Sequence, residues 1–118
     1  MQCKIPLKLP SLNEYINACR RNAYAGAKMK KDTETQIMWF VKRLPRFENP
    51  VTIHFHWIEG NQRRDYDNIS AAKKFILDAL VKAGKLKDDN RNFVKGYTDT
   101  FEYQKGVWKV ILIIEEEL

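Results

Sequence analysis

Four carboxylates in two short segments are the residues of this chain best suited to chemistry. Asp65-Tyr66-Asp67-Asn68 follows Arg63 and Arg64, and Asp88-Asp89 lies further along the chain. Hard cations such as Mg²⁺ take oxygen ligands, usually carboxylates together with waters and substrate phosphates. The two segments therefore form a candidate metal site. In the structural alternative, the first pair makes a turn and caps a helix while the second pair makes another turn, and spacing alone does not decide between these interpretations.

The segment between the two acidic pairs has the apolar periodicity of a helix from Asn68 to Ala83, with Gly84 as its C-cap. At about 100° per residue, Asp67, Lys74 and Asp78 fall on one face of this helix. Such a face is either a solvated row of ion pairs or the floor of a metal-dependent site. The core face consists of Ile69, Ala72, Ile76, Ala79, Leu80 and Ala83.

Other metal and thiol motifs are weaker. The segment that begins at Asp65 opens like a calcium-binding loop, but Ser70 and Ile76 occupy the positions that need Gly and Glu. His54 and His56 share one face of a predicted strand, without a third ligand at a supporting spacing, which favours histidines on a sheet surface. Cys3 and Cys19 form no CxxC pattern. They indicate free thiols in a reducing compartment, although the sequence does not exclude a bridge between them.

The composition predicts one soluble domain, residues 1–118, with a basic surface. The 118 residues carry a formal net charge of +6, and residues 20–46 alone hold eight Lys/Arg against Asp32 and Glu34. Such a run is either a solvated surface or a flexible loop that grips a phosphate backbone, with Lys28, Lys30 and Lys31 as the contacts. No apolar run is long enough to span a bilayer and no signal-peptide pattern is present, so we expect a cytoplasmic protein.

The order of elements predicts an α/β (α+β) fold, with helices packed on a small mixed sheet of about four strands. We expect strands over residues 2–8, 51–58, 93–103 and 107–114, the last of them inside the sheet because it is apolar on both faces. A helix begins at Asp32 or Thr33 with a Thr33-x-x-Gln36 capping box and ends before Pro45. Residues 11–31 are expected to be irregular and mobile, with a short helix near residues 12–19.

Taken together, these segments resemble the RusA family of Holliday junction resolvases. The resemblance rests on Asp65-Tyr66-Asp67-Asn68, Lys74, Asp78-Ala79-Leu80, Lys82-Ala83-Gly84 and Asp88-Asp89, with a looser match at Pro10-Ser11-Leu12-Asn13. The stretch from Asn68 to the lysine is about one helical turn longer than in the best-known member of the family. The choice of Lys74 over Lys73 as the family's lysine rests on its spacing to Asp78-Ala79-Leu80.

The resemblance implies a homodimeric, Mg²⁺-dependent endonuclease, with Mn²⁺ as a possible substitute, that cuts opposing strands of four-way DNA junctions. Asp65, Asp67 and Asp89 would hold the metal, with Asp88 the less favoured ligand of its pair. Lys74 would position or activate the water, or stabilise charge on the phosphate. Asp78 would orient Lys74 or, as the favoured role, pack the helix. The DNA contacts would come from Arg63, Arg64 and Lys73 together with Lys28, Lys30 and Lys31, and neither a membrane nor an organic cofactor is expected.

Two other classes of function compete with this one. In the first, the chain is a DNA-binding module without catalysis, such as a degenerate prophage protein, whose basic segment binds branched or single-stranded DNA while the acids only cap helices. In the second, it is a structural partner protein in which the acids are incidental. Every acid of the pattern is present, which favours the nuclease. Cleavage of a synthetic four-way junction with and without Mg²⁺ separates the three.

Overall fold

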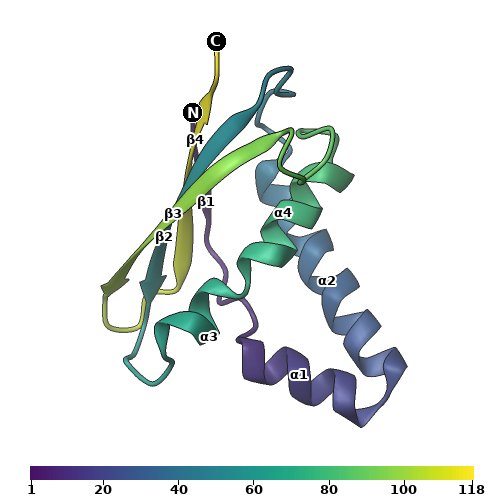
Figure 1. The fold of residues 1–118 in the computed structure, drawn as a ribbon. Coiled ribbons are helices and arrows are strands. Elements are labelled where there is room, and N and C mark those ends of the chain that lie inside the picture. The colour runs from purple at the N-terminus through teal and green to yellow at the C-terminus, as the bar shows by residue number, and fades with distance from the viewer.

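The computed structural model describes residues 1–118 as a four-stranded sheet with helices on one face (Figure 1). The strands are β1 (Gln2–Ile5), β2 (Val51–Glu59), β3 (Val94–Tyr103) and β4 (Lys109–Glu116), arranged in the order β1-β4-β2-β3. Strands β2 and β3 run parallel, whereas β4 is antiparallel to both β1 and β2. The predicted α+β fold with a mixed sheet is confirmed. So is the interior position of the last strand, because β4 lies between two neighbours.

The hydrophobic core lies between the sheet and helices α2 (Ala23–Val41) and α4 (Lys73–Lys82). Side chains alternate along β2, so that Ile53, Phe55 and Trp57 are buried under the helices while His54 and His56 lie on the opposite, open face. The helices contribute Ile37, Ile76 and Leu80, among others, to the same core. None of the helices is both long and apolar enough to cross a membrane.

The short helix predicted near residues 12–19 is confirmed as α1 (Leu12–Arg21). The expectation that the rest of residues 11–31 is irregular is wrong, because the chain continues directly from α1 into α2. Ser11 caps α1 in a capping box with Glu14. Asn22 ends α1 and caps α2, accepting a hydrogen bond from the Ala25 N–H at 2.7 Å. The predicted helix start at Asp32 or Thr33 is therefore wrong as well, and Thr33 lies buried in the middle of α2.

Gly26 allows α1 and α2 to pack closely. A Cβ atom at this position would lie 2.6 Å from the Cys19 Sγ atom and 3.1 Å from the Cys19 Cα atom, well inside normal contact distances. Both cysteines are free: Cys3 is buried and Cys19 is exposed. The helical hairpin of α1 and α2 projects beyond the sheet (Figure 1). The basic residues between positions 20 and 31 lie within these two helices.

The single helix predicted from Asn68 to Ala83 is divided into α3 (Tyr66–Ser70) and α4. Around Ala71 and Ala72 the backbone tightens, and the Lys74 and Phe75 N–H groups donate to carbonyls three residues back rather than four. No Gly or Pro marks this position, so the break left no signal in the sequence. The end of α4 is as predicted: Gly84 adopts a φ of +74° just beyond the helix, a conformation that favours glycine.

Candidate functional site

The acidic segment Asp65–Asn68 forms the start of α3. Asp65 occupies the N-cap position, but its side chain makes no capping hydrogen bond and remains exposed. The Asp67 carboxylate accepts one hydrogen bond, from the Asn68 N–H at 3.0 Å. Asn68 in turn accepts from the Asn13 N–H at 3.2 Å, which joins α3 to the start of α1. Neither carboxylate has a cationic partner within the chain, so both are free to bind a cation from solution.

Lys74 lies between two other acids of the pattern. Its Nζ atom is 3.2 Å from an Asp78 oxygen one turn along α4 and 3.2 Å from Asp89 Oδ2 in the following loop. Hydrogen bonds to Asp89 and then to Asp78 raise the pKa of Lys74 above its ordinary value. Lys74 therefore carries its positive charge at neutral pH. Since its side chain is 66 % exposed, these ion pairs are weak and can exchange with other anions.

Asp78 orients lysines as well as packing its helix. It contacts Lys74 and also Lys30 of α2, whose Nζ lies 3.2 Å from Asp78 Oδ2 and 2.8 Å from Glu34 Oε2. Glu34 is only 1 % exposed and also pairs with Lys82. A continuous row of alternating charges thus runs from α2 across α4 to the loop that carries Asp89. Packing was the favoured role for Asp78 in the sequence interpretation, which could not foresee its contact with α2.

The second acid of the loop, Asp88, makes local turn contacts. Its carboxylate accepts hydrogen bonds from the Asp89 N–H at 2.7 Å and from the Asn90 side-chain amide at 3.2 Å. These bonds shape the loop and leave Asp89 as the acid that faces Lys74. Asp88 therefore forms the turn, whereas Asp89 forms the ion pair with Lys74.

Lys73, a candidate DNA contact from the sequence, is instead held inside the fold. It donates to Asp99 Oδ2 at 2.7 Å, while the Trp57 indole donates to the other Asp99 oxygen at 2.8 Å. The Lys73 ammonium also lies 4.2 Å from the centre of the Tyr97 ring. Lys73 therefore anchors α4 to the sheet and is not free to contact a phosphate. Of the two adjacent lysines, only Lys74 reaches the acids of the pattern.

The two arginines before Asp65 have different environments. Arg64 forms a two-pronged ion pair with Glu59, with both N–O distances 2.8 Å, and donates to the Leu9 carbonyl, also at 2.8 Å. It is therefore a structural residue in this fold, and the predicted contact with DNA would require it to give up these bonds. Arg63 is exposed and makes no ion pair, which leaves it available to a phosphate.

The three lysines proposed as a basic arm also differ from one another. Lys28 pairs with Asp32 at 2.9 Å on the surface of α2, and a hydrogen bond to Asp32 raises its pKa. Lys30 belongs to the charge row described above. Lys31 is exposed and has no acidic partner. Only Lys31 presents a charge that its own helix does not already balance.

No three His, Cys, Asp or Glu side chains lie close enough together to hold a metal ion by themselves. The sequence interpretation had Asp65, Asp67 and Asp89 hold one or two Mg²⁺ ions, and the structure does not gather all three into one group. The residues present nevertheless fit Mg²⁺, which is commonly bound by only one or two carboxylates and otherwise by waters and substrate phosphates. The exposed, unpaired oxygens of Asp65 and Asp67 are of this kind.

The two histidines are surface residues of the sheet, as predicted. The side chains of His54 and His56 each make hydrogen bonds to threonines of β3. In addition, His56 Nε2 lies 2.8 Å from Glu102 Oε1. Hydrogen bonds from Gln104 and then from His56 lower the pKa of Glu102. The ring nitrogens of both histidines are therefore occupied by Thr98, Thr100 and Glu102 of β3, on the open face of the sheet.

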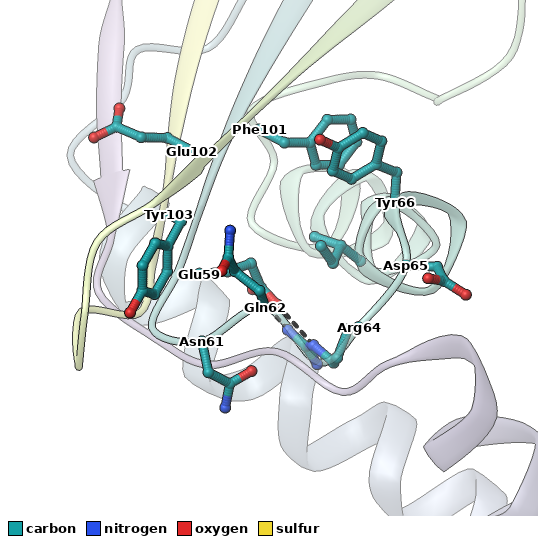
Figure 2. Close-up of a pocket in the computed structure, with 10 residues that line it drawn as sticks. Glu59, Asn61, Gln62, Arg64, Asp65, Tyr66, Phe101, Glu102 and Tyr103 are labelled. Atoms are coloured by element: carbon teal, nitrogen blue, oxygen red, sulfur yellow. Dashed lines mark hydrogen bonds and ion pairs between the residues drawn. The ribbon is translucent and has the colours of Figure 1, made fainter.

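A pocket of about 520 Å³ opens beside Asp65 (Figure 2). It is bounded by the end of β2, the loop that follows and the end of β3, and its floor carries the Glu59–Arg64 ion pair. Sequence reasoning missed this pocket, the buried acids Glu59 and Glu34, and the half-buried acid Asp99. For Asp99 a signal existed, since it occupies an inward position between Tyr97 and Phe101 in the period-two pattern of β3.

A comparison of the chain with protein-family models and with curated proteins finds no match.

Proposed function

We propose that this protein is a Mg²⁺-dependent endodeoxyribonuclease of the RusA type that resolves four-way DNA junctions. The observation that carries the proposal is that the chain presents both unpaired carboxylates and a positively charged lysine. Asp65 and Asp67 present carboxylates with no cationic partner, and a protonated lysine, Lys74, lies beside Asp89. In a protein with a net charge of +6, such acids are suited to a metal ion that arrives with a nucleic-acid phosphate.

In the proposed reaction, water hydrolyses a phosphodiester bond and leaves a 5′-phosphate and a 3′-hydroxyl. A bound Mg²⁺ would supply Lewis-acid stabilisation of the phosphate and lower the pKa of a bound water. Asp65 and Asp67 would hold the ion. Because its pKa is raised, Lys74 acts as a cation that stabilises charge on the phosphate and not as the base that activates the water.

The exposed ion pairs of Lys74 suggest how the DNA enters. A phosphate that reaches Lys74 can replace Asp89 as its partner at small cost, since both groups are in contact with solvent. The Asp89 carboxylate is then released and becomes available as a further ligand. Asp78 keeps Lys74 in place during this exchange through its own contact at 3.2 Å.

A homodimer is part of the proposal, because paired incisions across a junction require two sites related by a two-fold axis. The open face of the sheet supports such an arrangement. Along β4 this face carries Lys109, Ile111, Ile113 and Glu115, with opposite charges at its two ends and Ile113 38 % exposed. An axis across the strands would place Lys109 of one subunit opposite Glu115 of the other and bury the isoleucines between them. The pattern is therefore complementary to itself.

A DNA-binding module without catalysis is the second candidate. The observation in its favour is that no three acidic side chains are gathered at one point. The two candidates differ in one assay, in which a labelled four-way junction and a linear duplex of the same sequence are incubated with the protein in Mg²⁺ or in EDTA. The nuclease cuts the junction symmetrically and only with Mg²⁺. Binding without any cutting under either condition supports the module instead.

A further inference from the structure

The pocket beside Asp65 has aromatic rings on opposite sides. On one side Tyr66 stacks on Phe101, with ring centres 4.2 Å apart and ring planes 12° apart. On the other side lies Tyr103, which is 48 % exposed (Figure 2). Exposed aromatic rings around a hollow are suited to a flat apolar ligand, because such a ligand can stack against them.

Apart from Asp65, the polar groups of the pocket carry little net charge. Glu59 and Arg64 neutralise each other on its floor, and the Glu102 carboxylate points away from the hollow, toward His56 (Figure 2). The uncharged amides of Asn61 and Gln62 project at its mouth. Gln62 makes no side-chain hydrogen bond within the protein, while Asn61 uses only its oxygen, for the Arg63 N–H at 3.1 Å. These amides offer donors and acceptors but no binding site for a phosphate.

Asp65, one of the two acids assigned to the metal, also lines the pocket, and its carboxylate points outward from it (Figure 2). A nucleotide whose phosphate lies at Asp65 and Asp67 would therefore have its base within reach of the pocket. We propose that the pocket binds an unpaired nucleobase of the DNA strand next to the scissile phosphate. The proposal rests on the proposed function, and it identifies what the site recognises: a base that has left its stack at the strand crossover.

The base would stack on the aromatic side chains while the Asn61 and Gln62 amides contact its polar edge. Stacking of a base on an aromatic side chain contributes about 1–3 kcal/mol, so losing one ring should weaken binding about tenfold. The loss should appear only when a base is present at the crossover. This dependence separates the pocket from general phosphate contacts, which are indifferent to bases.

Fluorescence anisotropy in EDTA tests the proposal on two labelled four-way junctions, one intact and one with abasic residues at the crossover positions. We expect the wild type to bind the intact junction about tenfold more tightly. Gln62→Ala should reduce this preference, and Tyr103→Ala should abolish it. Trp39→Ala and Gln36→Ala, at exposed positions of α2 far from the pocket, are matched controls that should keep it.

A wild type that binds both junctions alike overturns the nucleobase pocket, as does full retention of the preference in both pocket variants. Cleavage of the intact junction in Mg²⁺ is measured in parallel. A pocket-dependent preference without cleavage supports the pocket and contradicts the nuclease, whereas cleavage without any preference contradicts the pocket alone. Wild-type protein that binds neither junction overturns both proposals.

Discussion

Replacing Arg64 with alanine should destabilise the fold, although the neighbouring Arg63 is dispensable for it. The Arg64 side chain is 13 % exposed and its partner Glu59 is 11 % exposed. The guanidinium also holds the Leu9 carbonyl, which lies at the entrance to α1. Arg64→Ala therefore leaves a buried carboxylate and a buried carbonyl without their partner.

The expected loss is about 3 kcal/mol, since removal of one member of a buried ion pair typically costs roughly 3–5 kcal/mol. The lower end is appropriate because the pair borders the solvent-filled pocket. For a chain of 118 residues the entropy of unfolding is about 0.25 kcal/mol/K, so the melting temperature should fall by about 12 °C. Arg63→Ala should leave the melting temperature within about 2 °C, as is usual for exposed sites.

Circular dichroism during heating measures both variants, and titration of a four-way junction at several salt concentrations measures their DNA binding. Arg63→Ala should lower the salt slope by about 0.9 per lost phosphate contact. An unchanged melting temperature for Arg64→Ala would refute the structural role assigned to this residue. A reduced salt slope for a fully folded Arg64→Ala variant would show that Arg64 contacts a DNA phosphate after all.

Three further predictions follow from the contacts of individual lysines and of the sheet face. Lys31→Ala should reduce the salt slope of junction binding by about 0.9. Lys28→Ala should reduce it less, because it removes a charge already paired with Asp32. Equal effects of the two variants would contradict the claim that only Lys31 is free to contact DNA. Lys74 has a raised pKa, so the stability from its ion pairs should be complete below about pH 10.5 and be lost as the pH rises further. Chemical denaturation of wild type and Lys74→Met should show a stability difference that shrinks above that pH, and a difference that grows would have the wrong sign. Light scattering should show a dimer that Lys109→Glu weakens and Lys109→Glu with Glu115→Lys restores; a monomeric wild type at tens of micromolar would exclude it.

The sheet and the pattern of its strands were predictable because alternation of apolar residues reports burial directly. Trp57 and Phe55 alternate with His54 and His56, and β4 is apolar enough for an interior strand. The start of α2 was missed because Thr33-x-x-Gln36 matches a capping box. The actual cap is Asn22, and most of the residues that follow it, up to Lys31, are Ala, Lys and Met, which have high helix propensity.

The candidate site was predictable only in part. The sequence identified the acids and Lys74, and the spacing of Lys74 to Asp78 made their ion pair foreseeable. The partners that come from distant segments were not foreseeable, since nothing in the sequence indicates that Lys73 meets Asp99 or that Lys30 meets Asp78. Adjacent residues such as Arg63 and Arg64 have the same chemistry, and only the tertiary fold decides which is buried.

Cleavage by Asp67→Asn tests the central claim most directly. The substitution keeps the shape of the side chain and its acceptor oxygen for the Asn68 N–H, but it removes the charge that a metal needs. We expect Mg²⁺-dependent cutting of a four-way junction to be lost, while junction binding stays the same or tightens because repulsion between phosphate and carboxylate is removed. Asp32→Asn, an exposed acid of α2, is the matched control and should cut normally. If Asp67→Asn cuts at the wild-type rate, the carboxylates of α3 are not the metal site and the proposed mechanism is wrong.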